Sequence, residues 1–398
     1  MAPRGGHFSP AKVYLAFVLL SLFVYFPAFD NPFRQDDLTF VRHVRSVGLR
    51  DLFVPSTDFA FYRPGALAVY ALEFVLFGES SGAYIVFNYL LHIVISLGML
   101  SVLRRMGVGA LGSCLASGLF LVGVGHYGKE IMWASTSGPL TSVVLSLLSL
   151  ILMFGWLSPG LRRSAVKTST RLVYPLGIFI AMGIAPLFHE ASLATAPVLL
   201  AMVLIYGPKA WRQRIRLAAP VLLALSIEAI VLKSVSDAYP TYRAGWGAVS
   251  QMPVHLTRYL GFMVLPIQRT GIVQLPGILR HIVGVASYAH VVLGLVGVIV
   301  LTTLAFKGAA LWRAMSVWLV LWLSPFTLVG MPEAWLELRY LYFASVPFCG
   351  LLGHGFDVLG SQRGGPMKWV RFVIIAGLVC MTVVLVTLLE RQYDQFQR

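Results

Sequence analysis

Two adjacent carboxylates, Asp36 and Asp37, follow the first long apolar stretch of the sequence. This placement is unusual beside a membrane span, because each carboxylate prefers water and the two repel one another. One of them can serve as a general base that deprotonates a hydroxyl group, while its neighbour tunes it or holds a divalent cation, Mg²⁺ or Mn²⁺. The alternative is structural, with the pair capping the next helix as N-terminal negative charge.

Tyr62-Arg63-Pro64 is the next motif along the chain. Pro64 predicts the first turn of a helix. Arg63 would then lie at the interface, where it pairs with a phosphate or a carboxylate, or extends to lipid headgroups. Further on, Asn88 and His92 are four residues apart and share a helix face. For these two we favour hydrogen bonding between helices over a role in ligand binding.

Four short connections between apolar stretches carry most of the other charged residues. If they meet at one water interface, Arg339, with Arg63 or Lys129, can bind an anionic headgroup while carboxylates act on an acceptor. Ordinary interfacial solvation with an aromatic belt is the alternative. The connections are His126 to Glu130 with Lys129, His189-Glu190, Glu333 to Glu337, and Arg339-Tyr340-Leu341-Tyr342.

Composition identifies the elements that must position these residues. Of 398 residues, 58% are hydrophobic and only 12% are charged. Apolar stretches of about 18 residues or more recur, each long enough to cross the hydrocarbon core. We therefore predict an all-α polytopic membrane protein with about eleven spans and ends uncertain by a few residues. The predicted spans are 12–29, 83–103, 109–126, 137–157, 172–187, 190–206, 215–235, 286–306, 311–330, 338–356 and 369–389.

The net charge of +15 is not read as a nucleic-acid-binding signal, because the basic residues form short clusters between the spans. An N-terminus in the cytoplasm places the basic clusters at 162–171 and 209–216 inside, as the positive-inside rule requires. Most carboxylates then lie outside. The active site is therefore expected on the extracytoplasmic face, in a plasma membrane or an endoplasmic reticulum membrane.

Two long extracytoplasmic loops, 30–82 and 236–285, complete a single membrane domain over 1–398. The stretch from His255 to Pro266 is read as interfacial or re-entrant, since a crossing there would invert every later basic cluster. Cys114, Cys349 and Cys380 lie in apolar spans with no CxxC spacing, so they are expected to be small core residues.

In this order the motifs resemble those of GT-C glycosyltransferases, and within them the protein O-mannosyltransferase-like group with a Tyr-Arg-Pro motif. The similar segments are Asn31-Pro32-Phe33 with Asp36-Asp37, Phe61 to Pro64, Leu76 to Gly78, Asn88 to His92, His126 to Trp133, His189-Glu190 with Pro197, and Trp335 to Tyr342. Three features depart from the group. His189 replaces its lysine, the His-Pro pair near 123–126 is missing, and no tetratricopeptide region follows the last predicted span.

The resemblance implies an inverting transfer of mannose, or another hexose or pentose, from a polyprenyl- or dolichyl-phosphate carrier to a glycan, lipid or protein acceptor. Asp36 or Asp37 would be the base, with Asp36 slightly favoured, and Arg339 with Arg63 would bind the departing phosphate. The other implied substrate contacts are Tyr62, His92, Lys129, Glu130, His189, Glu190 and Tyr340. No cofactor is required, although a cation held by Asp36 and Asp37 is an alternative. The rival functions are a transporter or flippase of lipid-linked sugars, which the intramembrane Glu228 keeps open, and a non-catalytic partner subunit.

Overall fold

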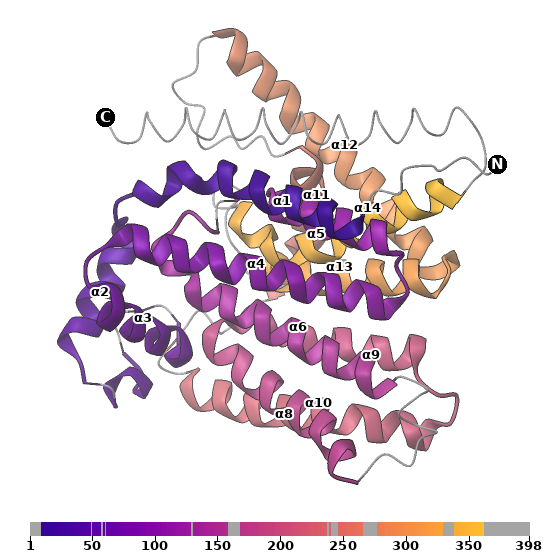
Figure 1. Ribbon diagram of the computed structural model, residues 1–398, viewed down its shortest axis with the longest axis horizontal. Helices are drawn as coiled ribbons and strands as arrows, with labels where there is room; N and C mark the ends of the chain where they lie inside the picture. The colour runs from indigo at the N-terminus through magenta and orange to yellow at the C-terminus, as the bar shows by residue number, and fades with distance from the viewer. Residues whose placement is uncertain are drawn as a thin grey trace.

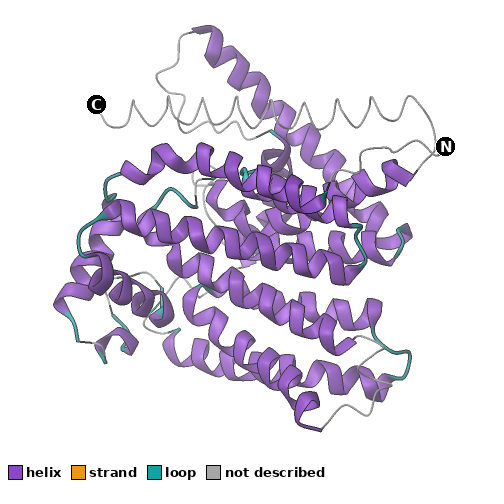
Figure 2. Cartoon of the chain, in the orientation of Figure 1, coloured by secondary structure: helices purple, strands orange, loops and turns teal. Residues whose placement is uncertain are grey.

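The computed structural model describes residues 9–361 except 49, 57–58, 60, 129, 158–167, 237–238, 240–245, 266–276 and 329–337. All secondary structure in this part of the chain is helical (Figures 1 and 2). Ten of the eleven predicted spans correspond to helices here, and the eleventh, 369–389, lies outside the described residues. These helices are α1 (Pro10–Tyr25), α4 (Ser81–Met106), α5 (Ala110–Leu121), α6 (Ser137–Leu157), α8 (Thr168–Phe188), α9 (Thr195–Tyr206), α10 (Trp211–Val235), α12 (Gly277–Lys307), α13 (Ala310–Leu328) and α14 (Tyr342–Ser361).

Six stretches in the described part are long and apolar enough to cross a membrane, and four further apolar helices are shorter. The six are Pro10–Asp30, Ser81–Met106, Ala134–Leu157, Trp211–Val235, Tyr288–Lys307 and Ala310–Leu328. Their outward faces carry large apolar side chains such as Phe23 and Phe306, each 80% exposed. Such faces are stable only against lipid, so the chain is an integral membrane protein.

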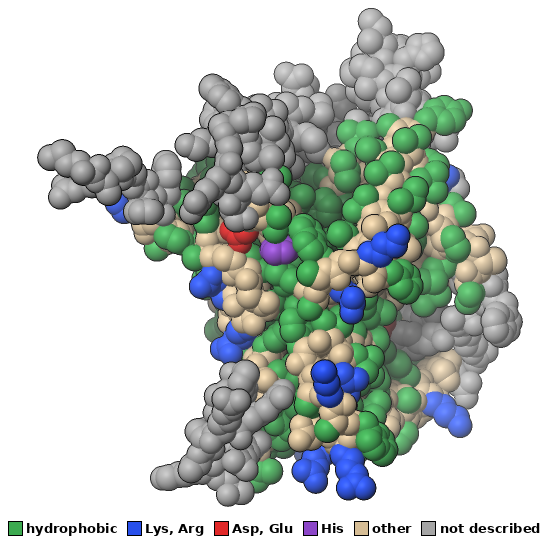
Figure 3. All heavy atoms as spheres, turned by 90° about the vertical axis from the view of Figure 1, so that its right-hand side faces the viewer, with side chains coloured by type: hydrophobic (Ala, Val, Ile, Leu, Met, Phe, Trp, Pro, Cys, Tyr) green, Lys and Arg blue, Asp and Glu red, His purple; other side chains and the backbone are tan. Residues whose placement is uncertain are grey.

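The helices run up and down, and their ends form two distinct ends of the bundle. At one end, which we call the basic end, the last turn of α4 carries Arg104 and Arg105, α12 ends at Lys307, and α10 and α13 begin with arginines. Asp357 of α14 also lies at this end, where it accepts a hydrogen bond from the Gly112 amide at the start of α5. Lys and Arg side chains are spread over the face seen in Figure 3, where little acidic surface is visible.

The opposite end, which we call the site end, contains the N-termini of α4, α6, α9 and α14 and the C-termini of α8, α10 and α13. Two helices of the first long loop also lie there, α2 (Gln35–Ser46) and α3 (Pro64–Phe77) (Figure 1). Short 3₁₀ helices complete the connections, η1 (Phe26–Asp30), η2 (Asp51–Phe53), η3 (Ala134–Thr136), η4 (Glu190–Ala194) and η8 (Leu338–Leu341).

The first long loop is folded onto the bundle around an aromatic cluster. Phe40 of α2 stacks on Tyr70 of α3 with ring centroids 4.7 Å apart, and on Phe59 at 4.9 Å. Gly138 of α6 lets α3 approach closely, since a Cβ there would lie 2.5 Å from the Ala66 Cβ. Small residues commonly allow such approaches between membrane helices. The elements that carry the first-loop motifs are thereby fixed to the spans.

The stretch predicted to be interfacial forms α11 (Trp246–Val264), which packs on α12 and α13. It bonds to site-end segments, because the Tyr127 hydroxyl donates to the Met263 carbonyl and His255 Nδ1 lies 3.3 Å from the Thr327 carbonyl. It is not among the candidate spans of the described chain. Cys114 and Cys349 are buried with free thiols, which confirms their predicted core role, and Cys380 lies outside the described residues.

Candidate functional site

Asp37 is a buried carboxylate that joins two segments of the site end. Its Oδ2 accepts the Arg34 amide at 2.8 Å, which caps α2, and its Oδ1 accepts the Ser135 amide at 2.7 Å. Only 1% of Asp37 is exposed. The structural alternative of helix capping therefore describes Asp37, and the same side chain ties the first loop to η3.

Asp36 occupies the preceding position in the first turn of α2 and is exposed. Consecutive side chains of an α-helix are rotated by about 100° around the helix axis, so the two carboxylates face different surroundings. Asp36 is thus the member of the pair that a substrate hydroxyl can reach from solvent.

Arg63 forms a bidentate ion pair with Glu190, across 127 residues of sequence. Its Nε lies 2.6 Å from Oε2 and its Nη2 2.5 Å from Oε1, and its guanidinium lies 3.9 Å from the Phe61 ring centroid. Burial alone would raise the pKa of Glu190, but the positive charge of Arg63 lowers it to about 2. The pair fixes the start of α3 to the connection between α8 and α9.

His189 lies beside this pair and is buried. Its Nδ1 accepts the Ala191 amide, which caps η4. Burial, followed by the nearby Arg63 charge and also the Arg339 charge, lowers the pKa of His189 to about 3. The ring is therefore neutral at ordinary pH and offers no positive charge to a phosphate.

Arg339 and Arg34 meet at one aromatic ring. The Arg339 guanidinium carbon lies 4.9 Å from the Trp133 ring centroid, and that of Arg34 lies 5.2 Å from it. Arg339 also lies 5.2 Å from the Tyr340 ring, which stacks on Phe326. Because Trp133 is two residues from Ser135, the bond partner of Asp37, the acidic motif of the first loop and the late arginine motif converge at the site end.

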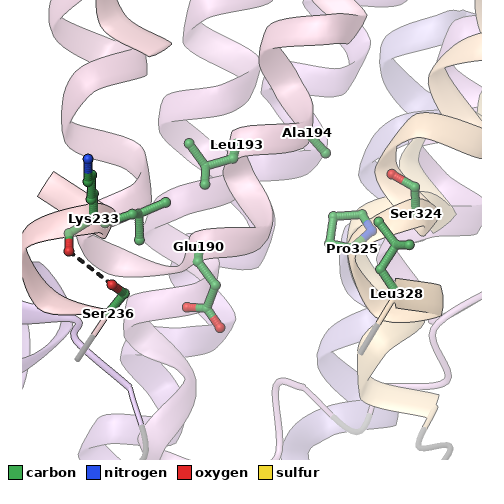
Figure 4. A pocket seen from close by; sticks show the side chains of 9 residues that line it. Glu190, Leu193, Ala194, Lys233, Ser236, Ser324, Pro325 and Leu328 are labelled. Atoms are coloured by element: carbon green, nitrogen blue, oxygen red, sulfur yellow. Dashed lines mark hydrogen bonds between the residues drawn. The ribbon is translucent and has the colours of Figure 1, made fainter. Parts of the chain in front are cut away.

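A cavity of about 500 Å³ opens beside Glu190 (Figure 4). Its walls come from η4, from the end of α10 and from the end of α13, and they are mostly apolar. Lys233 and Ser236 add polar groups at the α10 wall. The full lining is Glu190, Leu193, Ala194, Leu232, Lys233, Ser236, Ser324, Pro325 and Leu328. The apolar walls of this cavity suit the apolar part of a ligand.

The other predicted contacts are placed differently. His92 is fully buried between Tyr342, whose hydroxyl is 2.7 Å from Nδ1, and the Leu121 carbonyl, 3.1 Å from Nε2. Asn88 donates to the Trp133 carbonyl at 2.7 Å. Both side chains bond helices or turns together, as the favoured interpretation of this pair predicted.

The remaining predicted substrate contacts are Tyr62, Glu130 and Lys129. Tyr62 donates to the Phe53 carbonyl at 3.0 Å and Glu130 is 7% exposed, while Lys129 lies outside the described residues. Arg34, Trp133 and Ser135 were not predicted as site residues. Trp133 is the last residue of the segment His126 to Trp133, but its position in the sequence does not predict that Arg34 and Arg339 contact its ring.

Asp36 and Asp37 do not form a good divalent-cation site. Both oxygens of Asp37 already accept backbone amides, and Asp36 points into solvent. Among the described residues no group of three His, Cys, Asp or Glu side chains could hold a metal ion. Hard cations require several oxygen ligands, which these two carboxylates do not supply.

This arrangement of helices around a site end defines a GT-C-like membrane fold. No protein-family model matches the sequence, and no curated protein matches it. Among solved structures, ArnT from Cupriavidus metallidurans in the apo state is similar with a TM-score of 0.53 and 17% identity, over 93% of this chain and 64% of ArnT.

An oligosaccharyltransferase from Archaeoglobus fulgidus, tethered to an acceptor peptide containing the NVT sequon, is similar with a TM-score of 0.55 and 11% identity. The match covers 96% of this chain and 55% of that one, so the chain spans less than two thirds of either structure. At 17% and 11% identity, these two neighbours show a shared fold alone. The narrower resemblance to the Tyr-Arg-Pro group stays a prediction.

Proposed function

We propose that this protein transfers a sugar from a polyprenyl- or dolichyl-phosphate carrier to an acceptor hydroxyl on the extracytoplasmic face of its membrane. One observation carries the proposal. Asp37, the neighbour of the exposed Asp36, accepts the Ser135 amide, and the Arg339 guanidinium in η8 lies 4.9 Å from the Trp133 ring, so both motifs lie at the same end of the bundle. The GT-C-like fold and the cavity beside Glu190 support it.

Asp36 is the proposed general base. It takes the proton of the acceptor hydroxyl as the oxygen attacks the anomeric carbon from the side opposite the phosphate, which inverts the configuration. The bond between that carbon and the phosphate oxygen breaks, and its electron pair leaves with the lipid phosphate. Because a lipid phosphate is a good leaving group, no second acid is required. Asp37 positions the first turn of α2.

Arg339 is the proposed phosphate ligand, since a guanidinium offers paired donors that match phosphate oxygens and offset the developing charge. The isoprenoid tail would lie against the apolar wall that η4, α10 and α13 present. The donor sugar is a hexose such as mannose, or a pentose, and the acceptor is a glycan, a lipid or a protein. The first-loop aromatics and residues 236–285 would select that acceptor.

A radiolabelled polyprenyl-phosphate sugar, supplied to the protein reconstituted in liposomes, tests this function. The expected result is labelled acceptor together with free polyprenyl phosphate. Movement of intact donor between leaflets without bond cleavage would instead identify a flippase, for which the buried Glu228 of α10 is the relevant feature. Donor binding with neither outcome would identify a non-catalytic subunit.

A further inference from the structure

Glu73 is a buried carboxyl group that the proposed reaction does not use. It belongs to α3, and only 1% of the residue is exposed. The Ser137 hydroxyl, at the start of α6, donates a hydrogen bond to its Oε2 at 2.8 Å. Its Oε1 is also buried, and no hydrogen-bond partner for this oxygen lies among the described residues. A single hydroxyl of the described chain therefore stabilises this carboxyl group.

The bond to Ser137 lies on the contact between the first long loop and the spans. Ser137 follows η3 directly, and Asp37 of α2 accepts the Ser135 amide of the same η3 at 2.7 Å. The other oxygen of Asp37 accepts the Arg34 amide. The helices α2 and α3 are thus bonded to one short stretch of backbone, α2 through a carboxylate that accepts two amides and α3 through Glu73.

The titratable groups around Glu73 are acidic. Tyr70, on the preceding turn of α3, is 1% exposed, and its burial and the charges of Asp37 and Glu73 raise its pKa. Tyr84 of α4 and Glu130, which precedes η3, interact with the same hydroxyl more weakly. The helices α6, α8 and η2 also pack on α3, and within the described chain no lysine or arginine forms an ion pair with Glu73.

Burial without a neighbouring cation makes ionisation of Glu73 costly. It raises the pKa of Glu73 to about 8, although the Ser137 hydrogen bond acts in the opposite direction. The carboxyl group is therefore protonated at neutral pH while α3 is docked on α6. An exposed glutamate has a pKa of about 4.3, so Glu73 would lose its proton at neutral pH if α3 moved away. Proton binding and docking of α3 consequently favour one another.

We propose that protonated Glu73 is a positioning residue that docks α3 on α6, and that its ionisation releases α3 together with Arg63 at its start. The docking is independent of the proposed function, whereas its effect on sugar transfer rests on that function. The ratio of docked to released α3 is highest at acidic pH. It falls by up to about tenfold for each pH unit between the exposed pKa and about 8, and it is constant above that range.

Glu73→Gln tests this proposal, because glutamine keeps the shape of the side chain and stays neutral at every pH. Hydrogen–deuterium exchange of the α3 backbone, measured by mass spectrometry on the reconstituted protein, reports the docking. Comparing wild type with the variant at the same pH cancels the effect of pH on the exchange chemistry itself. We expect the ratio of wild-type to variant exchange rates to rise by about tenfold or more between pH 6 and pH 9. A ratio that does not change with pH would overturn the proposal.

Two further variants separate titration of Glu73 from simple loss of packing. Ser137→Ala removes a hydrogen bond that favours the ionised form, so the rise in α3 exchange should extend to higher pH. Glu79→Gln is the matched control, because Glu79 lies two residues after α3 and its side chain is 70% exposed. Its exchange should follow wild type. A pH-independent Ser137→Ala profile, or a Glu79→Gln profile like that of Glu73→Gln, would contradict the proposal.

Sugar transfer from the radiolabelled polyprenyl-phosphate donor separates this proposal from the function. The activity of Glu73→Gln relative to wild type should rise between pH 6 and pH 9, because only wild type releases α3. A constant activity ratio alongside a rising exchange ratio would overturn the positioning role. If wild type shows the pH-dependent exchange but transfers no sugar, the docking stands and the enzymatic function fails. If wild type transfers sugar while the exchange ratio stays flat, the function stands and this proposal fails.

Discussion

Asp36 and Asp37 are neighbours in sequence with opposite environments. Asp37 is buried and accepts two backbone amides, whereas Asp36 is exposed at the first turn of the same helix. Asp37 is poorly placed to meet a substrate hydroxyl, because it is buried and both of its oxygens already accept backbone amides. The capping role that the sequence offered is therefore that of Asp37, and Asp36 stays the proposed base.

The first prediction separates these roles. Asp36→Asn should lower sugar transfer by about two to four orders of magnitude, the usual contribution of a positioned general base, with little change in thermal stability. Asp37→Asn should instead destabilise the fold by about 1–3 kcal/mol, since it weakens two buried hydrogen bonds. Transfer assays and thermal unfolding in detergent measure both effects. Wild-type turnover in Asp36→Asn would remove it as the base.

The second prediction concerns the Arg63–Glu190 pair. The pKa of Glu190 is about 2 in the folded protein, below the value of about 4.3 for an unfolded glutamate. Its contribution to stability is therefore complete above the unfolded pKa and is lost as the pH falls towards 2. The Tm difference between wild type and Glu190→Gln should be large at pH 6 and smaller at pH 3.

Glu79→Gln is the control for this measurement. Glu79 pairs with Arg45 at 3.1 Å, but the two side chains are 70% and 68% exposed. Exposed pairs contribute little, so the control should match wild type at both pH values. A Tm difference for Glu190→Gln that does not change with pH would show that the pair does not account for the depressed pKa.

At the scale of elements, the hydrophobic pattern predicted the position of ten helices of the described chain, nine with ends within about five residues and α12 with a start nine residues too late. Apolar stretches are prominent in the sequence because a span must be long enough to cross the hydrocarbon core. In the long loops, the sequence predicted the start of α3 at Pro64 and offered a helix beginning at Asp36 and Asp37 as one alternative, but it predicted no helix over Trp246–Val264. The helix α2 is too polar to stand out against the spans, and α11 was recognised only as the semi-apolar stretch from His255 to Pro266. The sequence also did not predict that Arg34 and Arg339 contact the Trp133 ring, because these contacts join residues about a hundred positions or more apart.

The third prediction tests how α3 is held. Gly138→Ala would place a Cβ 2.5 Å from that of Ala66 and 3.4 Å from the Phe188 carbonyl oxygen, so α3 must shift away from α6. Overpacking of this kind typically costs about 1–3 kcal/mol, and the displaced Arg63 should reduce transfer as well. Gly183→Ala in α8 is the control, because no atom lies within 4 Å of its added Cβ. The control should be neutral in thermal unfolding, and an equally neutral Gly138→Ala would show that this contact does not position the loop.

For the whole molecule, the distribution of charge sets an expected orientation. The basic end carries Arg104, Arg105, Lys307 and Arg313 at helix termini, while Glu79 and Asp36 are exposed at the site end. Under the positive-inside rule the basic end faces the cytoplasm. The proposed site then faces the extracytoplasmic space, where lipid-linked sugars would reach it from the outer leaflet.

The last prediction measures this orientation with single cysteines. Cys114 and Cys349 are buried, so a background with Cys380→Ser should react little with a membrane-impermeant maleimide. Glu79→Cys, at the site end, should be labelled on intact cells, whereas Arg105→Cys, at the basic end, should be labelled only after the membrane is permeabilised. Both positions are exposed, so accessibility to solvent alone does not distinguish them. The reverse pattern would place the site in the cytoplasm, where the carrier's sugar would have to be presented from the inner leaflet, and the donor assay would then have to be repeated with the substrate on that side.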